Sequence, residues 1–378
     1  FSPFTMTLCV PALPAIQKEF AISFFEVQFV MSFFLLGLAL AQPLHGILAD
    51  RYGRRPVLLW GFGLFTLSSF ACAYVGDIYW FILFRFLQAI GIASGIVVAR
   101  AIVRDMTTID ETARYTAYLA AGMGIAPMLA PMLSGFLIEE SGWRFSFQLT
   151  AVLSVFVLVW LLSSLPETHK HIDSVESSFS KIRRNLLSLS RSLSFWGYTL
   201  IYSFSNAAFF AFLTNSPAFF INALNTGPAI FGVYMGAMSF FYVFGAMSGS
   251  LITQRVGMEK SLQYGLIGVS VSGLLMFISI SLWPTNLFSL IIPFFLLFSC
   301  QGVVNPTAMA GTMKNHADKA ATASGLSSSF AMAIGGVTTM LTAVFYSGSA
   351  LSLCIPVFFA ISVNVLSYSL VHMDKQHE

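Results

Sequence analysis

Long apolar segments recur along the chain and are separated by short polar turns. Eleven of them are about long enough to cross a bilayer, which takes about 20 residues. They lack the period-two alternation of barrel strands, so the pattern predicts transmembrane helices. These segments cover residues 25–48, 56–76, 79–103, 113–138, 144–164, 195–221, 228–252, 260–282, 286–312, 320–346 and 349–371. The shorter stretch from Phe1 to Pro14 is interpreted as the outer end of a first helix whose inner end is missing here.

The composition excludes a water-soluble protein. Hydrophobic residues make up 57% of the 378 residues and charged residues 9%. A soluble domain carries about 25% charged residues, and so few polar groups do not cover the surface of such a chain. The excess apolar surface is therefore expected to face lipid, and the bilayer is the first partner that the sequence predicts.

The positions of lysine and arginine predict the topology. If the amino terminus lies in the cytoplasm, the turns on that side hold most of the basic residues, and the outer turns hold Lys18 and Arg144. Both termini are then cytoplasmic. One long polar connection divides the chain into an amino-terminal bundle of six helices (residues 1–165), a cytoplasmic linker (166–193) and a carboxy-terminal bundle (194–378). Two such bundles are an arrangement that supports alternating access around a central site.

The turn between the second and third segments carries the strongest motif, Gly46-Ile-Leu-Ala-Asp50-Arg51-Tyr-Gly53-Arg54-Arg55. Gly46 is expected to allow close helix approach, and Gly53 a turn at positive φ. A weaker echo, Gln254-Arg255-Val-Gly257, follows the eighth segment. The motif resembles the signature loop of the major facilitator superfamily nearly residue for residue.

That resemblance implies the major facilitator fold, an all-α membrane protein with twelve transmembrane helices. It also implies a cytoplasmic latch in which Asp50 contacts the start of the 320–346 helix, and Arg54 or Arg55 lies near Asp105. Such contacts form in the outward-open state and break on inward opening.

A second motif, Arg85-Phe-Leu-Gln88-Ala-Ile-Gly91, lies in the fourth segment and resembles another pattern of the same superfamily. A lone arginine within a span costs at least ~2.5–3.5 kcal/mol at the bilayer centre. Arg85 is therefore interpreted as a cation that faces the cavity and affects proton coupling or binds substrate. The alternative is a structural or snorkelling arginine that hydrogen-bonds backbone carbonyls.

The fifth segment contains Gly122, Ala126, Pro127, Ala130 and Pro131, and it resembles the antiporter motif of the superfamily. Its two prolines each remove a backbone donor and are expected to bend the helix. The repeated Ala-Pro pattern is similar to that of the bicyclomycin and chloramphenicol resistance subgroup of drug–proton antiporters. The alternative is the ordinary kinking of a membrane helix.

The expected proton carrier is harder to place. Antiporters of this branch have a carboxylate where this chain has Thr7, and no acid lies clearly in mid-membrane. Glu26 and His45 remain as candidates, together with a residue in the missing part of the first helix. His45 titrates near neutral pH when it is unperturbed, although a packed histidine is the simpler interpretation.

Polar and aromatic positions on the segments that line the cavity in this family are the candidate substrate contacts. A greasy pocket with few polar anchors suits varied amphipathic solutes. The candidates are Gln42, Arg85, Gln88, Tyr202, Asn206, Phe209, Gln301 and Asn305.

Two functions remain open at this stage. The first is export of hydrophobic or amphipathic compounds from a bacterial cell across its inner membrane, coupled to protons. The second is transport of a specific anionic metabolite or siderophore-like solute, with Arg85 as the counter-charge. We expect a monomer that is not an enzyme and binds no cofactor, metal or nucleic acid, since the sequence shows no metal cluster, no nucleophile with a base and no phosphate loop.

Overall fold

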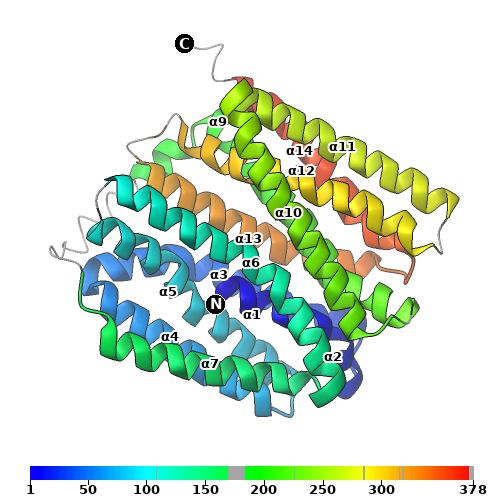
Figure 1. The fold of residues 1–378 in the computed structure, drawn as a ribbon, viewed down its shortest axis with the longest axis horizontal. Helices are drawn as coiled ribbons and strands as arrows, with labels where there is room; N and C mark the ends of the chain where they lie inside the picture. The colour runs from blue at the N-terminus through cyan, green and yellow to red at the C-terminus, as the bar shows by residue number, and fades with distance from the viewer. Residues whose placement is uncertain are drawn as a thin grey trace. The chain divides into compact units, whose positions relative to one another are not determined.

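The computed structural model describes residues 1–107, 109–168, 184–224, 226–283, 286–314, 316 and 319–373. The regular elements in this part of the chain are all helices (Figure 1). Internal contacts divide the chain into two compact units. The first unit comprises Phe1–Arg184 with Gly227–Gly232, and the second comprises Asn185–Thr226 with Val233–Glu378. The predicted linker over residues 166–193 stays a prediction, because residues 169–183 lie outside the described part.

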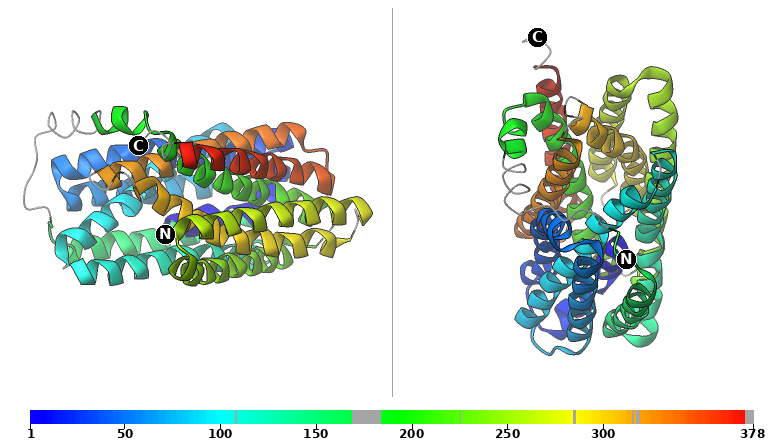
Figure 2. Two further views of the ribbon diagram at one scale, coloured as in Figure 1. Left: turned by 90° about the horizontal axis from the view of Figure 1, so that it is seen from above. Right: turned by 90° about the vertical axis from the view of Figure 1, so that its left-hand side faces the viewer.

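The first unit contains five long helices whose axes run alongside one another (Figure 2). They are α3 (Phe24–Tyr52), α4 (Arg54–Tyr74), α5 (Ile78–Met106), α6 (Ile109–Ser141) and α7 (Trp143–Ser164).

The segment before these helices is broken into α1 (Ser2–Leu8), a 3₁₀ turn (Val10–Ala12) and α2 (Leu13–Glu19). Pro11 and Pro14 remove backbone donors at this break, which leaves carbonyl groups without helical partners. The Leu8 carbonyl loses its helical partner because the Ala12 N–H turns to Cys9 in the 3₁₀ turn, and the Ser134 hydroxyl of α6 donates to it at 2.5 Å.

The second unit contains six long helices. They are α9 (Leu193–Pro217), which continues into a π-helical turn (Ala218–Ala223), and α10 (Pro228–Val256), α11 (Met258–Leu282), α12 (Leu287–Lys314), α13 (Ala320–Phe345) and α14 (Ala350–Met373).

Ten helices of the described part are long and apolar enough to cross a membrane. Together with α9 and the broken first segment they correspond to the twelve predicted segments. Helix α9 falls below the hydropathy of the ten because serine, threonine and asparagine recur along it, and most of these side chains are buried. The predicted all-α membrane protein is confirmed.

The two units share a local geometry that the sequence echo predicted. Gly53 and Gly257 precede α4 and α11 with nearly the same backbone angles, φ +94° and ψ 163° against φ +86° and ψ 163°. An ion pair then joins the start of that helix to the end of the next helix. Arg54 pairs with Asp105 in the first unit, and Glu259 pairs with Lys314 in the second. The two pairs have equivalent positions but exchanged charges, because the basic residue lies at the start of α4 and the acidic residue lies at the start of α11.

Charged side chains at the start of α7 bind the end of α4. Arg144 donates from Nη1 to the carbonyls of Ala73 and Val75, at 3.2 and 2.9 Å. The same guanidinium reaches Glu19 at 2.7 Å, and the indole N–H of Trp143 donates to the other carboxylate oxygen at 2.6 Å. Residues at the ends of α2, α4 and α7 are thereby held together.

Helices α4 and α5 pack unusually close to each other. A Cβ atom added at Gly61 would overlap the Ser94 hydroxyl and lie 2.7 Å from the carbonyl oxygen of Gly91. A Cβ atom added at Gly63, two residues further along α4, would have no atom within 4 Å. The close contact therefore depends on the absence of a side chain at Gly61, on the face of α4 that packs against α5.

We expect Gly61→Ala to destabilise the protein by roughly 1–3 kcal/mol, because the added methyl group forces α4 and α5 apart. Gly63→Ala is the matched control and should leave stability unchanged or raise it slightly, since alanine favours helix. Thermal unfolding of the two purified variants in detergent measures the difference. Equal midpoints for the two variants would contradict the proposed close contact.

The Glu19 cluster should respond to pH. Burial alone would raise the pKa of the Glu19 carboxyl, but the hydrogen bonds from Arg144 and Trp143 outweigh it and the pKa is lowered. A lowered pKa stabilises the fold above the unfolded-state value of about 4.3, and that stabilisation is lost as the pH falls through the folded-state value. We expect wild type to unfold ~2–4 °C above Glu19→Gln at neutral pH. The difference should shrink as the pH falls through the folded-state pKa of Glu19, and a difference independent of pH would refute the linkage.

Candidate functional site

Arg85 of α5 lies in the interior of the first unit with a fully buried side chain. Its Nη1 donates to Oε1 of Gln88, one turn along the same helix face, as the motif spacing predicted. The Gln88 amide then donates to the Ser69 hydroxyl of α4 at 2.8 Å. On the other side of the guanidinium lie Met31 Sδ, at 3.8 Å from Nη2, and the ring of Phe34, whose centroid is 4.1 Å away.

The guanidinium has incomplete electrostatic compensation. No carboxylate of the described residues forms an ion pair with Arg85, and its Nε atom has no hydrogen-bond partner among them. An aromatic face contributes about 2 kcal/mol to a desolvated cation, whereas removing an ion from water costs several kcal/mol. A buried cation of this kind attracts an anion or raises the energy of a proton nearby. Thr7, where the branch has its acid, is buried, and its hydroxyl donates to the Pro3 carbonyl at 2.8 Å.

Arg54 is the centre of the basic turn of residues 51–55. Its side chain is buried and pairs with Asp50 at 2.5 Å and with Asp105 at 3.0 Å. The structure thus brings Arg54, rather than Arg55, to Asp105. Arg51 is exposed and lies over the ring of Tyr52. The expected contact of Asp50 with the start of α13 joins the two units and stays a prediction.

Glu167 completes this network, and the sequence interpretation gave it no role. Its carboxylate accepts hydrogen bonds from the backbone N–H groups of Arg54 and Arg55, at 2.9 and 3.1 Å. It therefore caps the amino-terminal end of α4, where free donors and the helix dipole favour an anion. Gly53 makes room for it, since a Cβ atom there would lie 2.5 Å from the carboxylate. The Pro166-Glu167-Thr168 sequence after α7 marks this position, but it does not reveal that Glu167 caps the distant helix α4.

Gly46 does not provide the closest approach in this unit. A Cβ atom added there would meet Val97 at 3.9 Å, which is an ordinary contact. The close contact that was expected at Gly46 lies instead at Gly61 and Gly91.

The two candidate proton carriers lie in very different surroundings on α3. His45 is 8% exposed, and neither ring nitrogen has a hydrogen-bond partner among the described residues. Gln42 lies one turn earlier on the same helix and is also buried. Glu26 is partly exposed and forms a capping box, because its carboxylate accepts from both the backbone and the hydroxyl of Ser23 at 2.7 Å. Of the two, His45 has the buried site that proton transfer through a protein requires.

The helix with the antiporter motif, α6, continues through both Pro127 and Pro131. Ala130 is fully buried, whereas Gly122 would meet no atom within 4 Å if it carried a Cβ. Gly122 instead lines a cavity of about 480 Å³, together with residues of α4, α5 and α7 and with residues 1–3. Within the motif, Ala130 therefore packs against other residues, whereas Gly122 borders open space.

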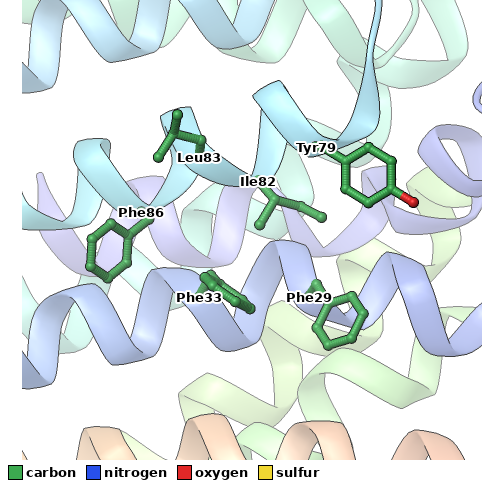
Figure 3. A pocket seen from close by; sticks show the side chains of 6 residues that line it. All are labelled: Phe29, Phe33, Tyr79, Ile82, Leu83 and Phe86. Carbon is green, nitrogen blue, oxygen red and sulfur yellow. The ribbon is translucent and has the colours of Figure 1, made fainter.

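An apolar groove of about 500 Å³ runs along the surface where α3 packs against α5. It is lined by Phe29 and Phe33 of α3 and by Tyr79, Ile82, Leu83 and Phe86 of α5, whose side chains face the space between the helices (Figure 3). None of the predicted cavity residues lines this groove. Its walls are almost entirely carbon, as expected for a surface in contact with lipid chains or apolar solutes.

The predicted site residues of the second unit lie on two helices. On α9, Tyr202, Asn206 and Phe209 recur at helical spacing and are all partly exposed. On α12, Gln301 and Asn305 are buried and one turn apart. Asn206 is tied to its own helix by a hydrogen bond to the Tyr202 carbonyl at 2.8 Å, and the ring of Phe209 contacts that of Phe298 at 5.5 Å. Both helices pack together in this unit, so the structure brings these polar and aromatic groups to one region.

Removal of the Glu167 carboxylate should weaken the start of α4. We expect Glu167→Ala to destabilise the protein by about 1 kcal/mol, the typical value of a lost helix cap, and to loosen the Arg54 network next to it. Thr168→Ala, at the adjacent position, is the control and should have little effect. Hydrogen exchange of the Arg54 and Arg55 amides reports the change directly, and unchanged protection in Glu167→Ala would contradict the capping role.

Comparison with known proteins agrees with this architecture. The model of the Major Facilitator Superfamily matches residues 1–340. A bicyclomycin resistance protein homolog of Haemophilus influenzae is 24% identical over 97% of this chain and 92% of its own. The chloramphenicol resistance protein CraA of Acinetobacter baumannii is 28% identical over 74% of this chain and 67% of its own.

Solved structures show the same fold. A bacterial homolog of the human lysosomal transporter Spinster, in an inward-facing and unoccupied conformation, superimposes with a TM-score of 0.78 at 14% identity. That superposition covers 98% of this chain and 93% of the other. The expected fold and the resemblance to the bicyclomycin and chloramphenicol resistance subgroup are confirmed. This chain is thus an integral, multi-pass membrane transporter that belongs to the Major Facilitator Superfamily.

Proposed function

We propose that this chain exports hydrophobic or amphipathic small molecules from bacterial cells, in exchange for protons, by alternating access across the inner membrane. It works as a monomer with both termini in the cytoplasm. The names of its relatives support this proposal, since they refer to resistance to bicyclomycin and chloramphenicol. Their similarity extends over most of this chain, including the antiporter-motif helix.

The chemistry of the second unit carries the proposal. Among its described residues no charged side chain is buried, whereas amides, hydroxyls and phenylalanine rings fill its interior. A site built from neutral polar groups and aromatic rings suits an uncharged or amphipathic solute. A carrier of a charged metabolite would instead be expected to place a counter-charge on the substrate.

In this proposal the first unit supplies proton coupling. His45 accepts and releases the proton, because it is buried and its nitrogens are free of other described partners. Arg85 acts on coupling through its uncompensated charge. The Arg54 network holds the basic turn closed in one state and is released in the other.

One observation favours a second candidate, a carrier of an anionic solute. The Arg85 guanidinium is fully buried, yet no carboxylate among the described residues pairs with it. A substrate carboxylate at this position would complete an ion pair. In that case Arg85 contacts the substrate itself.

Transport into proteoliposomes with an imposed pH gradient tests the first proposal and separates it from the second. We expect accumulation of a neutral drug that depends on the gradient, and a loss of at least about tenfold in His45→Gln. Arg85→Ala should abolish neutral-drug transport as well, because coupling fails for every substrate.

The opposite outcomes are equally clear. Loss of organic-anion flux alone in Arg85→Ala would favour the anion carrier. Drug flux that ignores every gradient would remove antiport from the proposal.

A further inference from the structure

Three buried amide side chains and one serine meet in the interior of the second unit, and together they form what we call the amide cluster. Gln301 and Asn305 come from α12, Asn364 from α14 and Ser205 from α9. Their side chains are 1%, 5%, 1% and 0% exposed. Two of these four residues, Ser205 and Asn364, have no part in the sequence motifs of the chain.

All three amides leave their oxygen unpaired. The Gln301 amide donates to the carbonyl of Ser205 at 3.4 Å, and the Asn364 amide donates to the hydroxyl of the same serine at 3.0 Å. Asn305 lies close to the side chain of Tyr242. The carbonyl oxygens of Gln301, Asn305 and Asn364 have no hydrogen-bond partner among the described residues.

The orientation of Gln301 is fixed by chemistry. The Ser205 carbonyl can only accept, so the amide nitrogen of Gln301 must face it and the oxygen must point elsewhere. A buried acceptor without a donor is unfavourable, and clusters with several such acceptors are uncommon in packed interiors. Three unpaired acceptors on α12 and α14, two helices that both pack against α9, therefore indicate a site that a hydrogen-bond donor completes.

The cluster contains no charge, which limits the kind of donor. A divalent cation is bound by carboxylates, and none of the cluster residues is acidic. Partly exposed aromatic groups lie beside the cluster, since Tyr242 is close to Asn305, and Tyr202 and Phe209 lie on α9 one turn to either side of Ser205 and Asn206. The surroundings thus combine apolar rings with neutral acceptors.

We propose that the amide cluster selects substrates by their hydroxyl or amide N–H groups, so that uncharged donor-bearing solutes are the class that this transporter recognises. The inference rests on the proposed export function and specifies its substrate. The partly exposed rings bind the apolar part of the solute, and the amide oxygens accept from its donors as the helices move.

This mechanism favours solutes that carry a hydrogen-bond donor over analogues that lack it. A solute that lacks the donor leaves the buried acceptors unpaired, and a site of this kind discriminates far more strongly than an apolar pocket does. Chloramphenicol carries two hydroxyls and one amide N–H, and its diacetate, in which both hydroxyls are esterified, keeps the amide N–H and lacks the two hydroxyl donors. Both probes have the same nitrophenyl ring, so their comparison reports on the hydroxyl donors.

The test is equilibrium binding of both probes to the full chain purified in detergent, without any gradient. We expect wild type to bind chloramphenicol at least about tenfold more tightly than the diacetate. Gln301→Met and Asn364→Leu conserve side-chain size and remove one oxygen each, and each should bring the ratio toward one. Asn215→Leu is the matched control, because Asn215 is a buried asparagine of the same unit that is bonded to Thr342 instead, and it should keep the wild-type ratio.

Several results would overturn the proposal. They are equal binding or no binding of the two probes by wild type, an unchanged ratio in folded Gln301→Met and Asn364→Leu, or the same loss in Asn215→Leu. If either of these variants does not fold, Asn305→Leu removes the third unpaired oxygen, and an unchanged ratio in that variant also refutes the proposal. Since binding is measured without a gradient, a failure of export in proteoliposomes counts against the proposed transport function and not against the amide cluster.

Discussion

The pairing of backbone and side-chain polar groups in a medium without water is the constraint on which this structure depends. Within lipid, an unpaired N–H or C=O group costs several kcal/mol, so each interruption of a helix needs a partner from the protein. The break between α1 and α2 is completed by the Ser134 hydroxyl of α6. Among the described residues, the unpaired atoms of Arg85, His45 and the amide cluster lie where transport chemistry is proposed, whereas others, such as Asn215 Oδ1, lie outside these sites.

The ends of α4 satisfy the same constraint with charges. Glu167 accepts from the first N–H groups of the helix, and Arg144 donates to its last carbonyls. Each charge has the sign that the helix dipole favours at that end. Arg144 lies at the start of α7 and Glu167 lies just after its end, so α7 is bound to α4 near both of its own ends. The first unit therefore has the internal stiffness that rigid-body movement of a bundle requires.

The long apolar segments and their boundaries were predictable, because the length and hydropathy of a membrane span are local properties of the sequence. Helical spacing placed Arg85 and Gln88 on one face, although it did not predict their hydrogen bond, and the family motif placed Arg54 or Arg55 near Asp105 without choosing between them. The roles of Glu167 and Glu19 could not be predicted, since each bonds a helix far away in the chain. The close approach at Gly61 was equally hidden, because a glycine in an apolar helix does not reveal which neighbour touches it. In the second unit Gln301 and Asn305 were expected, whereas Ser205 and Asn364 only gain meaning once α9, α12 and α14 pack together.

The two caps of α4 also set a length. The helix has 21 residues, which corresponds to about 32 Å at 1.5 Å per residue and is close to the hydrocarbon thickness of a bilayer. Because Glu167 and Arg144 hold its two ends, α4 cannot shift along its axis relative to α7 without breaking one cap. The length of this helix pair is consequently fixed and matches one thickness of the hydrocarbon layer. In a thicker or thinner bilayer the first unit must tilt as a whole, or the lipid must deform around it, and the protein should be sensitive to the acyl-chain length of its host membrane.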